Sequence, residues 1–244
     1  DGWCVELFHE VALEVAADIV FSYDRVDPKG SGAEVVESIL VSYERDMFKT
    51  GLGPETLCPI VHLPVGTLNV AEVASEIVAQ IAQEIRPALI AIPERELGDG
   101  ILTRMKTVKA IRRALNKLGF YQPLHILGTG NPTSIAALAL CGGDCFDGLE
   151  WCRTAANYET HSLLHFQHFD ALYEIYGGRI SKKEARRLVE LDGAPFALRA
   201  ASYNYDYFCD WMANVQFMLR SSEPEKLLRH IHILGPALAT AYNS

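Results

Sequence analysis

Two predicted strands of this chain end in residue types that are suited to chemistry. The run His125-Ile126-Leu127-Gly128-Thr129-Gly130-Asn131-Pro132 begins apolar and becomes a glycine-rich turn, and the run Gly143-Asp144-Cys145-Phe146-Asp147 ends in a carboxylate. Glycine has no Cβ, so the bare backbone of such a turn can lie against a flat ligand. In chains that alternate strands and helices, active sites collect at the carboxyl ends of parallel strands. We therefore expect the functional site at these two strand ends.

The elements that would position these residues alternate between strand and helix. Short apolar runs, typical of strands buried on both faces of a parallel sheet, occur at residues 18–22, 59–63, 88–92, 124–127 and 144–146, with a weaker one at 162–166. Helical patterns occur at residues 4–17, 33–49, 70–85, 100–118 and 132–140, and Gly119 is expected to end the fourth. This alternation predicts a right-handed α/β array.

After residue 168 the pattern becomes purely helical, at residues 182–191, 203–220 and 224–241. We therefore expect two parts. Residues 1–168 would carry the strand ends, and residues 169–244 would form a helical C-terminal layer.

Composition limits the class of protein. The 244 residues are 49% hydrophobic and 22% charged, which indicates a globular chain, and the net charge of −9 argues against broad, sequence-independent adhesion to nucleic acid. No apolar run reaches the roughly 20 residues that a membrane span needs. The six scattered cysteines predict reduced thiols in a cytoplasmic protein. Six basic residues recur along the helix predicted at 100–118, and we interpret them as its solvated face: Arg104, Lys106, Lys109, Arg112, Arg113 and Lys117.

Four motifs together resemble the tRNA-guanine transglycosylase superfamily. Residues 124–132 are similar to its Leu-Met-Gly-Val-Gly-x-Pro strand end, and Asp144-Cys145-Phe146-Asp147 to its Asp-x-Phe-Asp strand. Residues 18–24 resemble its base-recognition strand, and residues 95–99 take the place of its Leu-Ala-Val-Gly-Glu loop. The order of the four motifs, over roughly half the chain, is more specific than any one of them. The runs at residues 94–102 and 146–151 look most like the branch that acts on DNA, the 7-deazaguanine DNA transglycosylases.

The resemblance implies a pentosyltransferase that replaces guanine by a 7-deazaguanine base in DNA. Asp147 takes the position of the family's nucleophile, which attacks the sugar C1′ of the target guanosine. Base exchange with retained configuration needs such a covalent glycosyl intermediate, as in retaining glycosidases. The implied partners are nucleic acid (DNA rather than tRNA), the free base, and companion modification proteins. Without the motif, we would interpret a strand-end Asp as a cap for the next turn.

The resemblance also implies a set of binding residues. Asp24 would read the N1–H and exocyclic amine of guanine through two hydrogen bonds, although residues 24–30 also form a turn sequence. His62 takes the place of a base-contacting Gln of the tRNA enzymes, although a strand-end His can be a structural polar group. The other implied contacts are backbone groups of Leu127 and Gly128, a pocket rim at Arg95, Glu96 and Gly98, and a phosphate contact at Arg153.

Two departures from the family pattern affect the expected fold and chemistry. This chain lacks the C-x-C-x-x-C zinc motif of the tRNA enzymes, so we expect no metal, and we expect no cofactor because a carboxylate and a shaped pocket suffice for the exchange. The family's general-base Asp lies on a strand for which residues 4–17 offer only a helix pattern. Five or six βα units are also too few for an eight-stranded barrel. The chain opens on Asp1 rather than Met, so we expect a TIM-type (β/α) barrel that is incomplete at the N-terminus, inactive alone, with a helical C-terminal extension.

Three further patterns have competing interpretations. His161, His165 and His168 have helical spacing and could hold a metal, but no carboxylate or Cys completes a motif. An aromatic run could stack on bases, and we interpret it as core packing of the helical part: Tyr203, Tyr205, Tyr207, Phe208 and Trp211. Asp144 should face away from Asp147 on the strand, which excludes an acid–base pair.

Three alternative functions stay open. The first is a tRNA-guanine transglycosylase without zinc. The second is a non-catalytic barrel that binds a deazaguanine or scaffolds a modification complex. The third is an unrelated α/β-barrel lyase or hydrolase.

Overall fold

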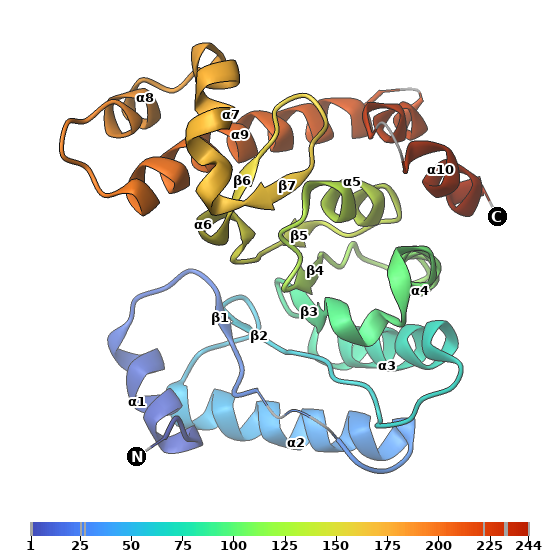
Figure 1. The fold of residues 1–244 in the computed structure, drawn as a ribbon. Helices are drawn as coiled ribbons and strands as arrows, with labels where there is room; N and C mark the ends of the chain where they lie inside the picture. Colours follow the sequence, from blue (N-terminus) through green and yellow to red (C-terminus); the bar gives the residue numbers. More distant parts are fainter. Residues whose placement is uncertain (1, 25, 27, 222, 232–233, 244) are drawn as a thin grey trace. The chain divides into compact units, whose positions relative to one another are not determined.

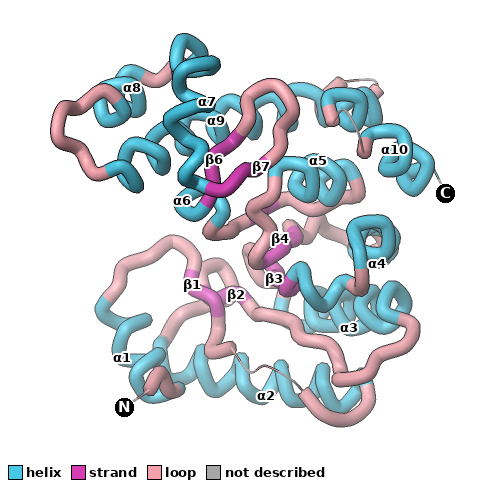
Figure 2. The backbone as a smooth tube through the Cα atoms, viewed as in Figure 1, coloured by secondary structure: helices cyan, strands magenta, loops and turns pink. Residues whose placement is uncertain are grey.

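The chain forms two compact units, each discontinuous in sequence (Figure 1). The computed structural model describes residues 2–24, 26, 28–221, 223–231 and 234–243. One unit comprises Asp1–Leu127 and Cys141–Cys145, and the other comprises Gly128–Leu140 and Phe146–Ser244. Helices and loops dominate both units, and the strands are short (Figure 2).

The first unit alternates helices and strands in the predicted order. Its elements are α1 (Val5–Glu14), β1 (Val20–Phe21), α2 (Gly32–Thr50), β2 (Leu57–Cys58), α3 (Val70–Ile85), β3 (Ile90–Pro93), the 3-10 helix η1 (Glu94–Leu97), α4 (Gly100–Leu115), β4 (Leu124–Leu127) and the first residue of β5 (Cys145–Phe146).

Neighbouring strands follow the order of the sequence. β1 pairs with β2 and β3 pairs with β4, both in parallel, and β5 is the hydrogen-bonded neighbour of β4. Ile60, just after β2, makes an isolated parallel bridge to Ala91 of β3. The array therefore runs β1 to β5 without the reversal that marks doubly wound sheets, and this sequential order is the one found in (β/α) barrels.

No closed barrel is present among the described residues, and the TIM-type barrel, incomplete at the N-terminus, that the sequence predicts is not shown. Their sheets have two, three and two strands, whereas a closed barrel of this kind takes about eight. β1, β2 and β5 are each 2 residues long, so few ladder hydrogen bonds hold them. The broader prediction of a mixed helix–strand fold agrees with the structure.

The helices of the first unit begin, end and pack for recognisable reasons. α2 starts with a capping box in which Ser31 and Glu34 bond each other's backbone, and it ends at Gly51 with φ 68°. α3 and α4 lie side by side (Figure 1) and pack through their apolar faces. The buried hydrophobic residues of the two faces are Ala74, Ile77, Val78, Ile81, Ala82, Met105, Val108, Ile111 and Leu115.

The second unit is mainly helical. It contains α5 (Pro132–Leu140), α6 (Glu150–Arg153), β6 (Thr154–Ala156), β7 (Leu163–His165), the 3-10 helix η2 (Phe166–His168), α7 (Phe169–Tyr176), the 3-10 helix η3 (Gly177–Arg179), α8 (Lys183–Val189), α9 (Phe196–Leu219), the 3-10 helix η4 (Pro224–His230) and α10 (Gly235–Asn243). β6 and β7 form an antiparallel pair.

Polar groups buried on α9 tie this unit together. Asp206 is fully buried and accepts hydrogen bonds from the Lys182 N–H at 2.6 Å, the Ser181 N–H at 3.0 Å and the Tyr158 hydroxyl at 2.9 Å. Asn204 is also fully buried, and its amide joins α9 to α6 and β6. An apolar cluster of α7, α8 and α9 residues surrounds Tyr203.

Most of the predicted elements are confirmed, with shifts at their ends. α3, α5 and β4 have the predicted bounds. The strand predicted at 59–63 is wrong in its bounds. The residues that form β2 are Leu57–Cys58, and within 59–63 only Ile60 pairs with a neighbour, through an isolated bridge. α4 ends at Leu115 rather than at Gly119, and α9 begins seven residues earlier than predicted, at Phe196.

The predicted helix at 224–241 is two elements, η4 and α10; residues 232–233 lie outside the described residues. Helices alone follow β7 among the described residues, in keeping with a helical C-terminal part, while a boundary at residue 168 stays a prediction. Among the described helices, none combines the length and the apolar character required to cross a bilayer.

Candidate functional site

Asp147 lines a cavity of about 460 Å³ in the second unit. The walls carry four aromatic side chains, Phe146, Trp151, Tyr205 and Phe208, together with apolar Ile135 and Met212 and the turn residues Thr129, Gly130 and Gly148. The cavity lies within the size range of small-molecule sites, which are mostly apolar with a few polar groups that orient the ligand. It therefore offers one carboxylate beside walls suited to a flat aromatic ligand.

Glycine-rich turns bring the Asp147 carboxylate to this cavity. Gly128 has φ 79°, a conformation that favours glycine, and its N–H donates to Asp147 Oδ1 at 2.9 Å. Gly130 and Gly148 approach so closely that a Cβ on Gly148 would lie 2.6 Å from the Gly130 N and Cα. These contacts bring the turn after β4 against the turn after β5. The Gly128 N–H is bonded to Asp147, so the contact expected of it with a heterocycle would require that bond to break.

The aromatic walls come from α9, from α6 and from Phe146 of β5. Tyr205, Phe208 and Met212 lie on one face of α9, and Trp151 lies on α6. The backbone carbonyl of Trp151 accepts a hydrogen bond from Asn204 Nδ2 at 2.7 Å, which ties α6 to α9. Tyr203, Tyr207 and Trp211 are buried. The prediction that the aromatic run packs the core is therefore confirmed for those three and wrong for Tyr205 and Phe208. Tyr205 and Phe208 are three residues apart and Met212 follows four residues later, a spacing that places all three on one helix face. This signal was present in the sequence.

A second carboxylate lies beside the same turns. Glu150 Oε2 is buried, and within the described part of the chain it has no hydrogen-bond partner. A Cβ on Gly130 would overlap it, which shows how closely it approaches the turn. Sequence reasoning did not single out Glu150.

In the first unit, the ends of three neighbouring strands bring together Asp24, His62 and Glu96, as predicted for strand-end residues. His62 Nε2 lies 2.5 Å from Asp24 Oδ1, and His62 Nδ1 is hydrogen-bonded to Glu96 Oε1. Glu96 Oε2 accepts the backbone N–H of Leu63 at 2.6 Å. Sequence reasoning placed all three at one site, but it did not foresee that His62 would bridge the two carboxylates.

Burial and charge act in opposite directions on His62. The side chain is 4% exposed, and burial alone would lower its pKa. The hydrogen bonds and negative charges of Asp24 and Glu96 outweigh that effect and raise the pKa of His62 to about 9. The ring is therefore an imidazolium at neutral pH, because both nitrogens must donate to carboxylates.

Asp24 lies at the exposed end of this cluster. Its side chain is 46% exposed. The preceding residue is anchored by α2, because fully buried Asp46 accepts the Tyr23 N–H at 3.0 Å and also bonds His9 Nε2 at 3.0 Å. The predicted turn at 24–30 includes Arg25 and Asp27, which lie outside the described residues.

The remaining predicted site residues occupy more open positions. Arg95 is 67% exposed, and together with Glu96 and Gly98 it lines an open cleft of about 650 Å³ in the first unit. The Gly98 carbonyl accepts from Arg104 Nε at 3.0 Å. Leu127 is the last residue of β4, and Arg153 is exposed at the end of α6. No described contact links either of these two to a ligand role.

Two structural interpretations need correction. Arg104 and Arg112 are not part of a merely solvated face: Arg104 pairs with Glu94, and Arg112 binds the Gly142 carbonyl and pairs with Asp144. Asp144 also accepts the Leu124 N–H at 2.8 Å, so its role is structural.

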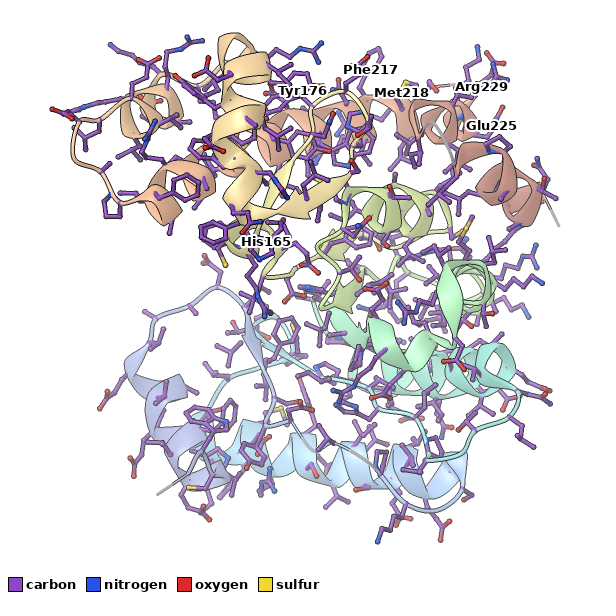
Figure 3. All side chains as sticks on the ribbon, viewed as in Figure 1. His165, Tyr176, Phe217, Met218, Glu225 and Arg229 are labelled. Carbon is purple, nitrogen blue, oxygen red and sulfur yellow. The ribbon has the colours of Figure 1, made fainter. Side chains whose placement is uncertain are left out.

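The three histidines with helical spacing do not share a helix. His161 lies in the turn between β6 and β7 with φ 57°, His165 ends β7 (Figure 3) and His168 ends η2. These residues form a hairpin and not a helix, because β6 and β7 pair with each other in antiparallel orientation. Among the described residues, no group of His, Cys, Asp and Glu is arranged to hold a metal ion.

The comparison with protein-family models gave no match, and the comparison with curated proteins gave none either. A function for this chain is therefore inferred from its own residues.

Proposed function

We propose that this protein exchanges guanine for a 7-deazaguanine base, such as 7-cyano-7-deazaguanine, in DNA through a covalent glycosyl intermediate on Asp147. One observation carries the proposal: the carboxylate that the family resemblance marks as nucleophile lines a cavity with four aromatic side chains. Aromatic stacking on a base contributes about 1–3 kcal/mol and tolerates any base. The open array β1 to β5 would then be part of a TIM-type barrel, and the six free cysteines fit a cytoplasmic enzyme.

The chemistry needs a carboxylate and a shaped pocket. The target nucleotide leaves the base stack to enter the cavity. Asp147 attacks C1′, the bond from C1′ to N9 breaks, and its electron pair leaves with guanine, which takes up a proton. The incoming base loses its N9 proton, and N9 then attacks C1′ and releases the Asp147 carboxylate. Two successive displacements retain the configuration at C1′.

Substitution of Asp147 tests this assignment in the full-length protein. We expect Asp147→Asn and Asp147→Ala to abolish exchange of labelled guanine, while the exposed carboxylate variant Asp192→Asn keeps it. A denaturation-resistant protein–DNA adduct should form with the native protein in the absence of incoming base, and it should be missing from both Asp147 variants. Undiminished exchange by Asp147→Ala would eliminate Asp147 as the nucleophile.

The same assay separates the alternatives. Exchange into tRNA and not into DNA would identify a tRNA enzyme. Calorimetric binding of guanine by the full-length protein, without exchange into either nucleic acid, would identify a binding protein. Stacking on the cavity walls would serve a binding protein and an enzyme alike, so it does not separate them. Contact with the nucleic-acid backbone is tested by Arg153→Gln, which removes an exposed cation and should reduce the salt dependence of nucleic-acid binding.

A further inference from the structure

A second cavity in the helical unit shares no lining residue with the Asp147 cavity. Its volume is about 330 Å³, within the size range of small-molecule sites, and all the residues that line it belong to the second unit. Four aromatic side chains and two charged ones determine its chemistry: Tyr158, His161, Tyr207, Trp211, Arg179 and Asp210. We call it the Arg179 cavity.

We propose that the Arg179 cavity binds a free α-amino acid with an aromatic side chain. Arg179 binds the carboxylate of the ligand, Asp210 binds its ammonium group, and the aromatic walls contact its side chain. The proposal goes beyond the base-exchange reaction and does not depend on it, since it involves neither Asp147 nor a nucleic acid.

Contacts within the protein hold the aromatic walls in place before a ligand arrives. The His161 ring stacks on Trp211, with centroids 4.0 Å apart and planes at 30°, and its Nδ1 is hydrogen-bonded to the Tyr207 hydroxyl at 3.0 Å. The Tyr158 ring meets Tyr207 edge-on at 5.1 Å, and its hydroxyl donates to buried Asp206 at 2.9 Å. An aromatic ligand adds a ring to this set, and aromatic pairs contribute more than their buried area alone.

His161 has a backbone conformation that residues other than glycine rarely adopt. Its φ is 57°, in the left-handed region, and its N–H donates to the Asn157 carbonyl at 3.0 Å in the turn between β6 and β7. Such a conformation costs free energy and is concentrated at ligand sites, where surrounding contacts maintain it. Here it accompanies a ring that stacks on Trp211 at the wall of the cavity.

The two charged groups at the cavity are not paired with each other. The Arg179 guanidinium lies 5.2 Å from the ring centroid of Tyr176, which ends α7 (Figure 3), and none of the described residues accepts a hydrogen bond from it. Asp210 Oδ1 accepts from Ser181 Oγ at 3.3 Å and lies 3.6 Å from Lys182 Nζ, whereas Oδ2 has no partner within the described part of the chain. A guanidinium matches a carboxylate, and a carboxylate oxygen accepts from an ammonium group.

This distribution of charge favours a zwitterion over a plain anion or a plain cation. An anion such as phosphate would meet the Asp210 carboxylate, and a simple amine would meet the Arg179 guanidinium. Contacts between like charges select against such ligands. A ligand that carries both an ammonium and a carboxylate group satisfies both side chains.

The test measures calorimetric binding of three probes to the full-length protein. They are L-phenylalanine, phenethylamine, which lacks the carboxylate, and 3-phenylpropionate, which lacks the ammonium group. L-phenylalanine should bind about 5- to 20-fold more tightly than either analogue, because each analogue loses one charged contact at a partly exposed site. Arg179→Gln should remove the advantage over phenethylamine, and Asp210→Asn should remove the advantage over 3-phenylpropionate.

Matched controls make the same substitutions at exposed positions outside the cavity. Arg187→Gln and Asp192→Asn should keep all three native affinities. His161→Ala should weaken the three probes together, because it removes an aromatic wall and changes neither Arg179 nor Asp210.

Tryptophan fluorescence provides a second readout, which locates the bound ligand. The chain has three tryptophans, so a protein with Trp3→Phe and Trp151→Phe retains Trp211 alone. L-phenylalanine should change the emission of Trp211 with the dissociation constant found by calorimetry.

Three results would overturn the inference. The native protein could fail to bind L-phenylalanine at millimolar concentration, or it could bind all three probes equally. Binding that is unchanged in both Arg179→Gln and Asp210→Asn would place the ligand elsewhere, as in the Asp147 cavity. None of these results affects the proposed base exchange, which the Asp147 variants test separately.

Discussion

Raising the pH should weaken the folded protein through His62. Its pKa is raised from 6.5 to about 9 in the folded state, a difference that corresponds to about 3 kcal/mol of folding free energy. A group whose folded pKa is raised stabilises the protein fully below its unfolded value. That contribution is lost progressively as the pH rises from about 6.5 and is gone above about 9. The side chain is 4% exposed, so solvent screening reduces the effect little.

The assay is denaturant unfolding followed by circular dichroism at several values between pH 5.5 and 10. We expect the free energy of unfolding of the native protein to fall by about 3 kcal/mol more than that of His62→Gln between pH 6.5 and 9. Other groups that titrate at high pH affect both proteins and cancel in the difference. His168→Gln should follow the native curve. Parallel curves for native protein and His62→Gln across this window would refute the reasoning, since they would show that His62 holds no raised pKa.

Two further predictions concern the Asp147 cavity. Gly148→Ala should lower the free energy of unfolding by about 1–3 kcal/mol and weaken base binding, because the new Cβ would lie 2.6 Å from backbone atoms of Gly130. In Gly178→Ala the new Cβ meets nothing within 4 Å, so denaturant unfolding and binding calorimetry should both give the native values. Asn204→Ala should lower the free energy of unfolding by about 2–4 kcal/mol, because it leaves the Trp151 carbonyl of α6 and the Ala156 N–H of β6 without their partner. Asn214→Ala, at an exposed α9 position, should lower it by under about 0.5 kcal/mol, and equal losses would contradict this account.

Local patterns predicted the elements better than the contacts between them. α3 and α5 have the predicted bounds because apolar periodicity, or a Pro start, marks them along the sequence. β4 does so because its apolar run ends at Gly128. The strand predicted at 59–63 shows the limit of such patterns, because an apolar run fixes burial but not which residues pair with a neighbour.

The candidate sites show the same division. Asp147, Asp24, His62 and Glu96 could be placed at strand ends from the sequence, because strand ends position functional side chains. That Glu96 would bind both His62 and the Leu63 N–H depends on how β2 and β3 are placed side by side, which no local pattern encodes. Once α9 is known to be a helix, its geometry accounts for the aromatic run. Tyr203, Tyr207 and Trp211 are buried, while Tyr205 lines the cavity.

The path of the chain has a practical consequence for any attempt to dissect this protein. Residues 128–140 belong to the second unit, yet residues 141–145 return to the first, where Asp144 holds Arg112 and the Leu124 N–H. A single cut therefore cannot separate the two units cleanly, because residues 128–140 and 141–145 belong to different units. A recombinant fragment that stops at the end of β4 would lack Asp144, which binds Arg112 and the Leu124 N–H. A fragment of residues 128–244 would keep residues 141–145 as the link after α5, but without the first unit that they pack in.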